Sequence, residues 1–214
     1  MTEIIENNDK LTRDFYEVLG PEWLEEKASA LHTEAIMEKI LIHVRSNDKI
    51  LDVCCGYGRL TIPLIQKGFD VKGIDISEVL IKRASWLYAQ TGSSGNPFFV
   101  ANMKHFPFSS GAFDFCFCVW ASFNFLITEH EQLTFLQEVY RTLKKGGAAL
   151  IECPLQQEPD DCRNVYVGNV NYLCRPITID ELKNIGSKSS FEHLDVCVES
   201  IAGRNRAICL LRKS

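Results

Sequence analysis

Short apolar runs alternate with segments of helical period along most of this chain. A strand followed by a helix and then by another strand favours parallel pairing of the two strands, with the helix packed on the sheet. The sequence therefore predicts an α/β fold whose central sheet is covered by helices on both faces. The expected strands are 49–53, 71–74, 98–100, 113–119 and 148–152, and the expected helices are 29–44, 59–67, 78–90 and 129–144.

The end of the chain departs from this alternation. Two strands are expected at about 191–199 and 206–212 with no helix between them, and a turn around Ala202 and Gly203 joins them. Consecutive strands joined by a short turn pair antiparallel. The predicted sheet is therefore seven-stranded and mostly parallel, and it closes with an antiparallel hairpin.

Two segments of the form Thr-x-x-Glu mark expected helix starts, because the threonine and glutamate side chains can each bond a backbone N–H of the first turn. They begin at Thr128 and Thr178. The first twenty-five residues are polar with scattered aromatic side chains, and we expect one or two short helices there. Residues 154–177 have no clear period and are expected to form a long connection.

The chain has 214 residues, a length typical of one domain. Its 46% hydrophobic and 24% charged residues are ordinary for a globular protein, and a net charge of −5 speaks against a broadly basic nucleic-acid surface. The acidic start at residues 1–6 is unlike a signal peptide, and the charge-free stretch 115–128 is shorter than a membrane helix requires. We therefore expect a cytoplasmic domain without a membrane or nucleic-acid partner.

Nine cysteines occur, and none of them belongs to a Cys-x-x-Cys pair. Neither a structural zinc site nor disulfides are therefore expected, and no metal ligand is assigned. Several cysteines stand within apolar runs, where we expect them to be small buried hydrophobic residues. These are Cys116, Cys118, Cys197 and Cys209.

The segment from Asp52 to Arg59, Asp-Val-Cys-Cys-Gly-Tyr-Gly-Arg, is the most informative one for function. A strand that ends in an acid runs there into a turn of small residues and then into a helix. Small residues let the backbone approach a ligand, and the start of a helix attracts a carboxylate or phosphate. Asp52 could accept hydrogen bonds from an ammonium group. The amino-acid end of S-adenosylmethionine carries both an ammonium and a carboxylate, and it matches these charges better than a pyrophosphate does.

A second acid, Asp75, follows Gly56 by about 20 residues and ends the next predicted strand. An acid in this place can accept from both ribose hydroxyls of an adenosine, and Ile76 could then pack on the adenine. The alternative is that Asp75 only caps the following helix. Because it follows the first turn so closely, we favour the nucleoside interpretation.

Together these residues resemble the class I S-adenosylmethionine-dependent methyltransferases, from about residue 30 to the C-terminus. Cysteine replaces the first glycine of the family's turn, which predicts a backbone angle at Cys54 that other residues can adopt. The resemblance implies a single methyltransferase domain over residues 1–214, built as a Rossmann-like three-layer sandwich. The family's acid and its three alternating glycines match Asp52, Cys54, Gly56 and Gly58.

The resemblance also implies S-adenosylmethionine as the cofactor and S-adenosylhomocysteine as its product. The family usually has aspartate where this chain has Asn102, in the segment that reads the adenine amino group, but an amide oxygen can accept from the same group. Val119 ends the strand that faces the methyl donor. The residues assigned to the cofactor are Asp52, Cys54, Gly56, Gly58, Arg59, Asp75, Ile76, Asn102, Met103 and Val119.

The methyl acceptor is expected over the ends of the fourth and fifth strands. Because a sulfonium methyl is already electrophilic, alignment of the acceptor is the main requirement, and no catalytic base is assigned. Residues 1–28 are expected to form N-terminal cap helices, and residues 154–177 a substrate-covering insertion. The acceptor residues are expected to be Trp120, Asn124 and Tyr172, near Ser122, Phe123 and Phe125 and under a lid of Phe15, Tyr16 and Trp23.

A compact chain with a modest covering segment favours a small-molecule acceptor. Three alternatives remain open. The first is a regulatory module that binds the cofactor without turnover, and the second is a methyltransferase that acts on RNA or protein. The third is a nicotinamide oxidoreductase, although the chain lacks a Tyr-x-x-x-Lys pair after the fourth strand.

Overall fold

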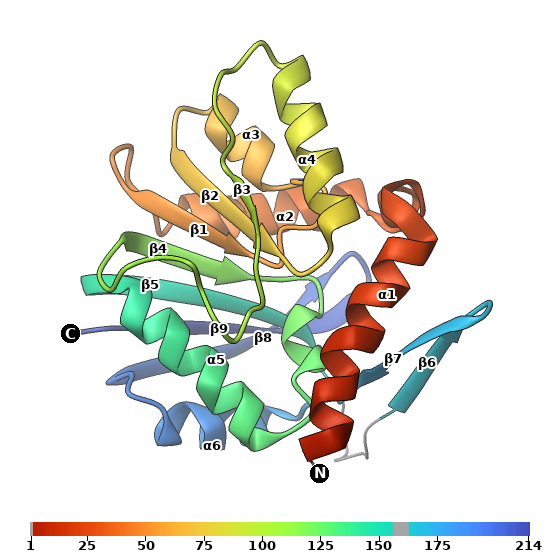
Figure 1. The fold of residues 1–214 in the computed structure, drawn as a ribbon. Coiled ribbons are helices and arrows are strands. Elements are labelled where there is room, and N and C mark those ends of the chain that lie inside the picture. The colour runs from red at the N-terminus through yellow and green to blue at the C-terminus, as the bar shows by residue number, and fades with distance from the viewer. Residues whose placement is uncertain (1, 156–162) are drawn as a thin grey trace.

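The computed structural model describes residues 2–155 and 163–214, and its centre is a seven-stranded sheet (Figure 1). The strand order is β3-β2-β1-β4-β5-β9-β8, in which β1 to β5 are parallel and β9 and β8 are antiparallel. This confirms the predicted sheet. The order reverses between β1 and β4, where such folds open a ligand-binding crevice. The strands are β1 (Lys49–Val53), β2 (Asp70–Asp75), β3 (Phe98–Val100), β4 (Phe113–Cys118), β5 (Leu143–Pro154), β8 (His193–Ile201) and β9 (Arg204–Arg212).

Helices cover both faces of this sheet, because alternate side chains of each buried strand point to opposite sides. In β4, Phe115 and Phe117 pack in one cluster with α2 and α3, whereas Cys116 and Cys118 pack in another with α5 and α6. The fold is therefore the predicted Rossmann-like three-layer sandwich. The helices are α2 (Ala30–Leu41), α3 (Thr61–Gln66), α4 (Glu78–Gln90), the 3-10 helix η1 (Ser122–Phe125), α5 (Glu129–Thr142) and α6 (Ile179–Lys188).

Both predicted capping boxes are present. At the start of α5, the hydroxyl of Thr128 accepts the N–H of Glu131 at 3.2 Å, and the carboxylate of Glu131 accepts the N–H of Thr128 at 3.2 Å. Thr178 and Glu181 form the same reciprocal pair at the start of α6. Each box satisfies N–H groups that have no partner within the helix, so both helix starts could be read from the sequence.

The predicted C-terminal hairpin is confirmed at one edge of the sheet. Ile201 of β8 pairs with Arg204 of β9, so Ala202 and Gly203 form a two-residue turn with φ of +50° and +74°. Positive φ at both positions is the type I′ turn, whose twist matches that of the strands. Because β8 is the edge strand, Cys197 is exposed there. The expectation that this cysteine is buried is therefore wrong.

The N-terminal segment forms one long kinked helix, α1 (Thr2–Lys27), where one or two short helices were expected. The kink lies at Gly20, whose φ of +78° is not helical, directly before Pro21, which has no N–H to continue the helix. α1 passes along α4 and the strand β7 (Val170–Cys174), across the edge of the sheet where the strands β1, β2 and β4 end (Figure 1). Neither α1 nor any other helix in the described part of the chain is long and apolar enough to cross a membrane.

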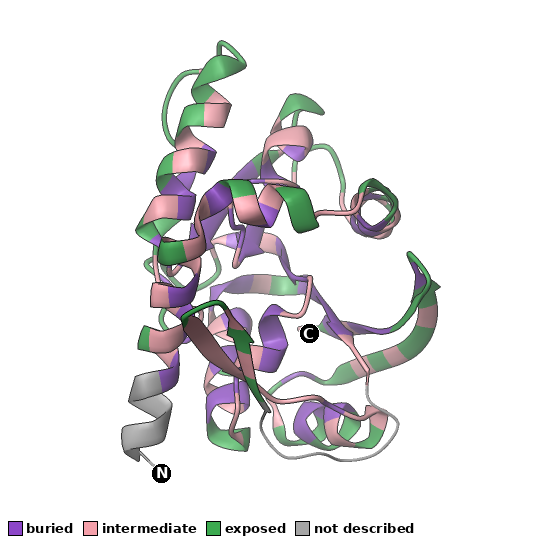
Figure 2. Ribbon diagram, turned by 90° about the vertical axis from the view of Figure 1, so that its right-hand side faces the viewer, coloured by how far each residue is buried: buried purple, intermediate pink, exposed green. Residues whose placement is uncertain are grey.

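A second, two-stranded sheet lies outside the main one and packs on α1 (Figure 2). It consists of β6 (Arg163–Val167) and β7 (Val170–Cys174), an antiparallel hairpin within the predicted insertion 154–177. The long-connection prediction is therefore wrong for this part, where Gly-Asn between two apolar runs is a hairpin signal. Residues 156–162 of the same insertion lie outside the described residues.

Candidate active site

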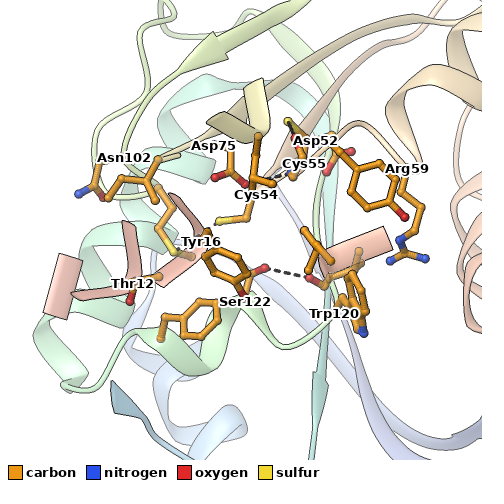
Figure 3. A pocket seen from close by; sticks show the side chains of 18 of the residues that line it. Thr12, Tyr16, Asp52, Cys54, Cys55, Arg59, Asp75, Asn102, Trp120 and Ser122 are labelled. Carbon is orange, nitrogen blue, oxygen red and sulfur yellow. Dashed lines mark hydrogen bonds between the residues drawn. The ribbon is translucent and has the colours of Figure 1, made fainter. Parts of the chain in front are cut away.

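A cavity with an empty volume of about 910 Å³ lies at the carboxyl ends of β1, β2 and β4, with residues of α1 on its other side (Figure 3). Every residue predicted to bind the cofactor lines it except Gly58. Of the three predicted acceptor residues, Trp120 lines it, whereas Asn124 and Tyr172 do not. A concave site at the switch point of an α/β sheet is the usual place for a small ligand.

Asp52, at the end of β1, is a buried carboxyl group that borders the cavity and is only 2% exposed. Its Oδ2 accepts a hydrogen bond of 2.6 Å from the hydroxyl of Thr61. Burial raises the pKa of Asp52 to about 7, against the lowering effects of the Thr61 hydrogen bond and the Arg59 charge. A cation beside this carboxylate would offset the desolvation and lower the pKa again. The surroundings of Asp52 therefore fit an ammonium group.

The turn after β1 brings the backbone close to the cavity. The φ angle is +62° at Cys54, +56° at Gly56 and +84° at Gly58. The backbone of a residue other than glycine can lie in this left-handed region at a conformational cost of about 1–2 kcal/mol, and the backbone of Cys54 does so. A Cβ at Gly58 would lie 2.9 Å from the ring of Phe98, so this glycine lets the turn pack on β3 rather than face the cavity. α3 begins at Thr61, later than predicted.

Asp75 ends β2 and is also buried. Its Oδ2 accepts the N–H of Gly56 at 2.9 Å, and its Oδ1 accepts the N–H of Ser77 at 2.9 Å. The hydroxyl of Ser77 caps α4 by accepting the N–H of Leu80 at 3.3 Å, so the cap of that helix is not Asp75. Burial raises the pKa of Asp75, and the backbone N–H groups of Ser77, Gly56 and Ile76 oppose this shift. The carboxylate still has lone-pair capacity for a further donor, which fits a ribose hydroxyl.

Asn102 lies at the opposite end of the cavity from Arg59 (Figure 3). Its Oδ1 accepts the N–H of Lys104 at 2.9 Å, and its Nδ2 donates to the Asp9 carboxylate at 2.7 Å. The Nζ of Lys104 lies 2.9 Å from the carboxylates of both Asp9 and Glu131. Asp9 belongs to α1 and also lines the cavity. Asp9 was not among the predicted site residues, because no local pattern connects two residues that are 93 positions apart.

The cavity wall near the end of β4 combines aromatic rings with hydroxyl groups. The rings of Tyr16 and Phe125 are edge to face, with centroids 6.1 Å apart. Burial raises the pKa of Tyr16 well above its ordinary value, so its phenol stays neutral. The buried hydroxyl of Thr12 has no hydrogen-bond partner among the described residues, and Ser122 donates to the carbonyl of Val119 at 3.0 Å. In the described part of the chain, no histidine lines the cavity.

Trp120 stands in a strained turn at the end of β4. The φ angles of Trp120 and Ala121 are +61° and +70°, which costs each residue about 1–2 kcal/mol. The N–H of Trp120 donates to Oε2 of Glu152 in β5 at 2.5 Å. The guanidinium of Arg59 lies 4.6 Å from the centroid of its indole, a cation–π contact. Glu152 was not foreseen either, because in the sequence it is only a polar residue at the end of an apolar strand.

Asn124 and Tyr172 support this wall from outside the cavity. The amide Nδ2 of Asn124 donates to the carbonyl of Arg175 at 2.9 Å, and the N–H of Arg175 donates to the carbonyl of Asn124 at 2.8 Å. The ring of Tyr172 packs edge-on against Phe15 and Phe125, with centroids 4.6 and 5.0 Å away. The two residues therefore fix the wall, but they do not line the cavity.

The sequence segment that builds this site has counterparts in known proteins. The family described as "Methyltransferase domain" matches residues 50–147, which run from β1 into β5 and contain Asp52, Asp75 and Trp120. Over this stretch the chain is similar to methyltransferases. S-adenosylmethionine, the cofactor expected from the sequence, is typical of that family.

Two curated relatives and one solved structure illustrate the similarity of this chain to known proteins. The putative methyltransferase YqeM of Bacillus subtilis (strain 168) is 35% identical over 49% of this chain and 41% of its own length. The demethylmenaquinone methyltransferase of Bacillus velezensis is 29% identical over 62% of this chain and 57% of its own length. The chain thus spans about half the length of these relatives. An S-adenosylmethionine-dependent methyltransferase from Clostridium acetobutylicum has the same fold, with a TM-score of 0.68 and 15% identity over 94% of this chain and 98% of that one.

Proposed function

We propose that this methyltransferase transfers the methyl group of S-adenosylmethionine to a small-molecule acceptor by in-line displacement. The observation that carries the proposal is that two buried carboxyl groups, Asp52 and Asp75, border the same cavity as the aromatic wall at Trp120. A donor bound at the carboxyl groups and an acceptor bound at the wall would share this cavity. Methyl transfer then requires chiefly that the acceptor is held in line with the methyl group of the donor.

The amino-acid end of the cofactor would bind at the turn after β1. Asp52 accepts from the ammonium group, which offsets the desolvation of its carboxylate. The backbone of Cys54 and Gly56 lies against the chain of the methionine moiety, because positive φ keeps the turn tight there. Arg59 lines the cavity and offers a positive charge to the carboxylate of the cofactor.

The adenosine end would bind between β2 and β3. Asp75 accepts from the ribose through the lone-pair capacity that its backbone donors leave free. Ile76 and Met103 supply apolar surface for the adenine. Its amino group would find two acceptors at this end of the cavity, the Oδ1 of Asn102 and the carboxylate of Asp9.

The acceptor would lie against the wall near Val119 and Trp120. The bound cofactor supplies an electrophilic methyl group, so the residues of the wall act by positioning, which can lower a barrier by about 7–11 kcal/mol. We propose that α1 and the β6–β7 hairpin cover the acceptor, and an enclosed wall favours a small molecule over RNA or protein. The relative from Bacillus velezensis is named for demethylmenaquinone, a small acceptor, which supports the same class.

Calorimetry with S-adenosylhomocysteine tests the cofactor half of this proposal. We expect Asp52→Ala and Asp75→Ala each to weaken binding by at least about tenfold, because each removes an acceptor that the ligand needs. Asp70→Ala, at the opposite end of β2, is the matched control and should leave the affinity within about twofold. Wild-type affinity in correctly folded D52A and D75A would contradict the assignment.

Transfer of a labelled methyl group to cell-extract fractions tests the acceptor half. We expect label in the small-molecule fraction. Label confined to RNA or protein would instead support the alternative acceptors. Tight binding of S-adenosylhomocysteine without transfer to any fraction would support a regulatory module without turnover.

A further inference from the structure

Three buried charged or ionisable side chains meet beside Trp120 and take no part in the proposed cofactor site. Glu152 of β5 is fully buried, and its Oε1 lies 3.0 Å from Nη1 of Arg206 in β9 and 3.5 Å from Nε2 of His32 in α2. Its other oxygen, Oε2, accepts the N–H of Trp120 at 2.5 Å. One carboxylate therefore connects α2, β9 and the end of β4.

This cluster is poorly suited to stabilise the fold. A buried ion pair is often less stabilising than apolar side chains of the same size, because its charges lose their water. Within the described residues, Oε1 of Glu152, Nε of Arg206 and both ring nitrogens of His32 lack hydrogen bonds, so the Arg206 contact is an ion pair without hydrogen-bond geometry. Burial raises the pKa of Glu152, but His32, Arg206 and the Trp120 N–H outweigh it and hold the pKa below its ordinary value. Because burying this charge is unfavourable for stability, its presence indicates that Glu152 holds a neighbouring group in a particular conformation.

The group that this charge holds is a strained turn. Trp120 and Ala121 are consecutive residues with left-handed backbone, a state that persists only where the surroundings fix it. The bond from the Trp120 N–H to Glu152 is charge-assisted and short, the stronger kind of hydrogen bond. It restrains the first residue of the turn at the peptide group that precedes the indole-bearing Cα.

The conformation of this backbone turn sets the position of the Trp120 indole. The ring of Trp120 faces the guanidinium of Arg59, and both side chains line the same side of the cavity (Figure 3). α2 contacts both partners of Trp120, since His32 faces Glu152, the acceptor of the backbone N–H, and the next residue, Thr33, accepts from Nη1 of Arg59 at 2.6 Å. The indole of Trp120 is thus held by one connected set of groups, which are the Glu152 carboxylate, the strained turn and the Arg59 guanidinium.

We propose that Glu152 is a positioning residue, which fixes the strained Trp120–Ala121 turn and thereby holds the indole of Trp120 against Arg59 at the acceptor wall. The relevance of this role to methyl transfer rests on the proposed function, whereas the effect of Glu152 on the position of the indole does not. Glu152 itself does not line the cavity, so it acts through Trp120.

Fluorescence of Trp120 alone can test this role. The chain has three tryptophans, and the double variant Trp23→Phe, Trp86→Phe leaves Trp120 as the sole emitter. In this background, E152L removes the acceptor of the Trp120 N–H, while E152Q removes the charge but keeps a carbonyl acceptor. A121G relieves the left-handed strain at the second residue of the turn.

We expect E152L to shift the emission maximum of Trp120 and to raise its quenching by acrylamide, and E152Q, which loses the charge but keeps an acceptor, to change both signals less. Adding A121G to E152L should return both signals toward the parental values, because a relaxed turn needs less restraint. A purely structural role of the charge would not be relieved by a glycine in the turn. Affinity for S-adenosylhomocysteine should stay within about threefold in E152L, because Asp52 and Asp75 are untouched.

Unchanged emission in E152L would overturn the proposal, and so would equal effects of E152Q and E152L. It would also be overturned if A121G had the same effect on the Trp120 signals with and without E152L.

If E152L does not fold, amide hydrogen exchange of the parental protein provides the test. The Trp120 N–H must then exchange far more slowly than that of Asn47, an exposed loop residue, and equal rates would overturn the proposal. A wild-type protein that fails to bind S-adenosylhomocysteine would refute the proposed function, and the Trp120 signals would still judge the role of Glu152.

Discussion

Asp52 carries a single charge that governs how ligand binding depends on pH. Its pKa of about 7 in the free protein means that it is half protonated at neutral pH, whereas an ammonium ligand needs the anion. We therefore expect the affinity for S-adenosylhomocysteine to fall roughly tenfold between about pH 8 and about pH 6, since binding must then displace a proton. Calorimetry across this range measures the slope. Asp52→Asn should bind weakly at every pH without a slope, and a flat wild-type profile would contradict the pKa.

The same carboxyl group gives the free protein the opposite pH dependence of stability. Its folded pKa lies above the unfolded value, so between about pH 4 and about pH 7 the folded state binds more protons and the free energy of unfolding falls as pH rises. Asp52→Asn keeps an acceptor for Thr61 without the charge. We expect it to melt above the wild type at about pH 8 and close to it at about pH 4. Thermal denaturation without ligand, with Asp70→Asn as the control, would contradict this if the difference did not change with pH.

Individual site residues could be predicted from the sequence where their partners are neighbours in the chain. Asp52 and Asp75 each stand at the junction of a strand and a turn, so both could be recognised from a few contiguous residues. Asp9 and Glu152 could not be, because they meet Asn102 and Trp120 across 93 and 32 residues. Only the folded sheet and the position of α1 bring these pairs together.

At the scale of the elements, the β8–β9 hairpin contains a removable strain. Ala202 has φ of +50° in a type I′ turn, where asparagine is preferred because it tolerates the left-handed region. Ala202→Asn is expected to raise the free energy of unfolding by about 0.5–1 kcal/mol. Urea denaturation measures the change. Gly203→Ala, at φ of +74°, should lower the same quantity, and a destabilised A202N would show that the turn has another geometry.

The capping box of α5 offers a second test at this scale. Thr128→Ala should lower the free energy of unfolding by about 1 kcal/mol, because the N–H of Glu131 loses its acceptor. Thr134, in the middle of the same helix, is the matched control, and T134A should change stability by less than about 0.5 kcal/mol. Equal losses in the two variants in urea denaturation would mean that the cap contributes nothing.

Elements with strong local signals could be predicted, and elements that depend on docking could not. Capping boxes and apolar runs are written in a few adjacent residues. The strands of the main sheet and the starts of α5 and α6 lay close to where the sequence placed them, except that β5 begins at Leu143, within the predicted helix 129–144. β6 and β7 are five residues each, lie outside the main sheet and pack on α1. The length of α1 depends on the same contact. The Gly-Asn turn is a local signal for the β6–β7 hairpin, but its packing on α1 cannot be read from periodicity, since each element provides the surface on which the other packs.

At the scale of the whole molecule, Asn8 fastens α1 to the acceptor side of the site. It is buried, its Nδ2 donates to the carbonyl of Phe125 at 2.9 Å, and its Oδ1 accepts the N–H of Leu173 at 2.9 Å. Asn8→Ala would leave both backbone groups without these bonds. We expect it to lower the free energy of unfolding by about 2–4 kcal/mol and to speed hydrogen exchange in α1. Asn47→Ala, at an exposed loop, is the control, and unchanged exchange in N8A would show that α1 is held elsewhere.

The placement of α1 over the cavity allows the residues that face the acceptor to change separately from the residues that bind the donor. Thr12 and Tyr16, with Asp9 one turn earlier, line the cavity from a single stripe of this helix, because residues three and four apart share a face. Asp52 and Asp75 line the cavity from the sheet edge opposite, and within the stripe Asp9 belongs to the adenine end. Divergence toward new acceptors, in evolution or in a library randomised at positions 12 and 16, can therefore proceed on one short surface while the donor end is inherited intact.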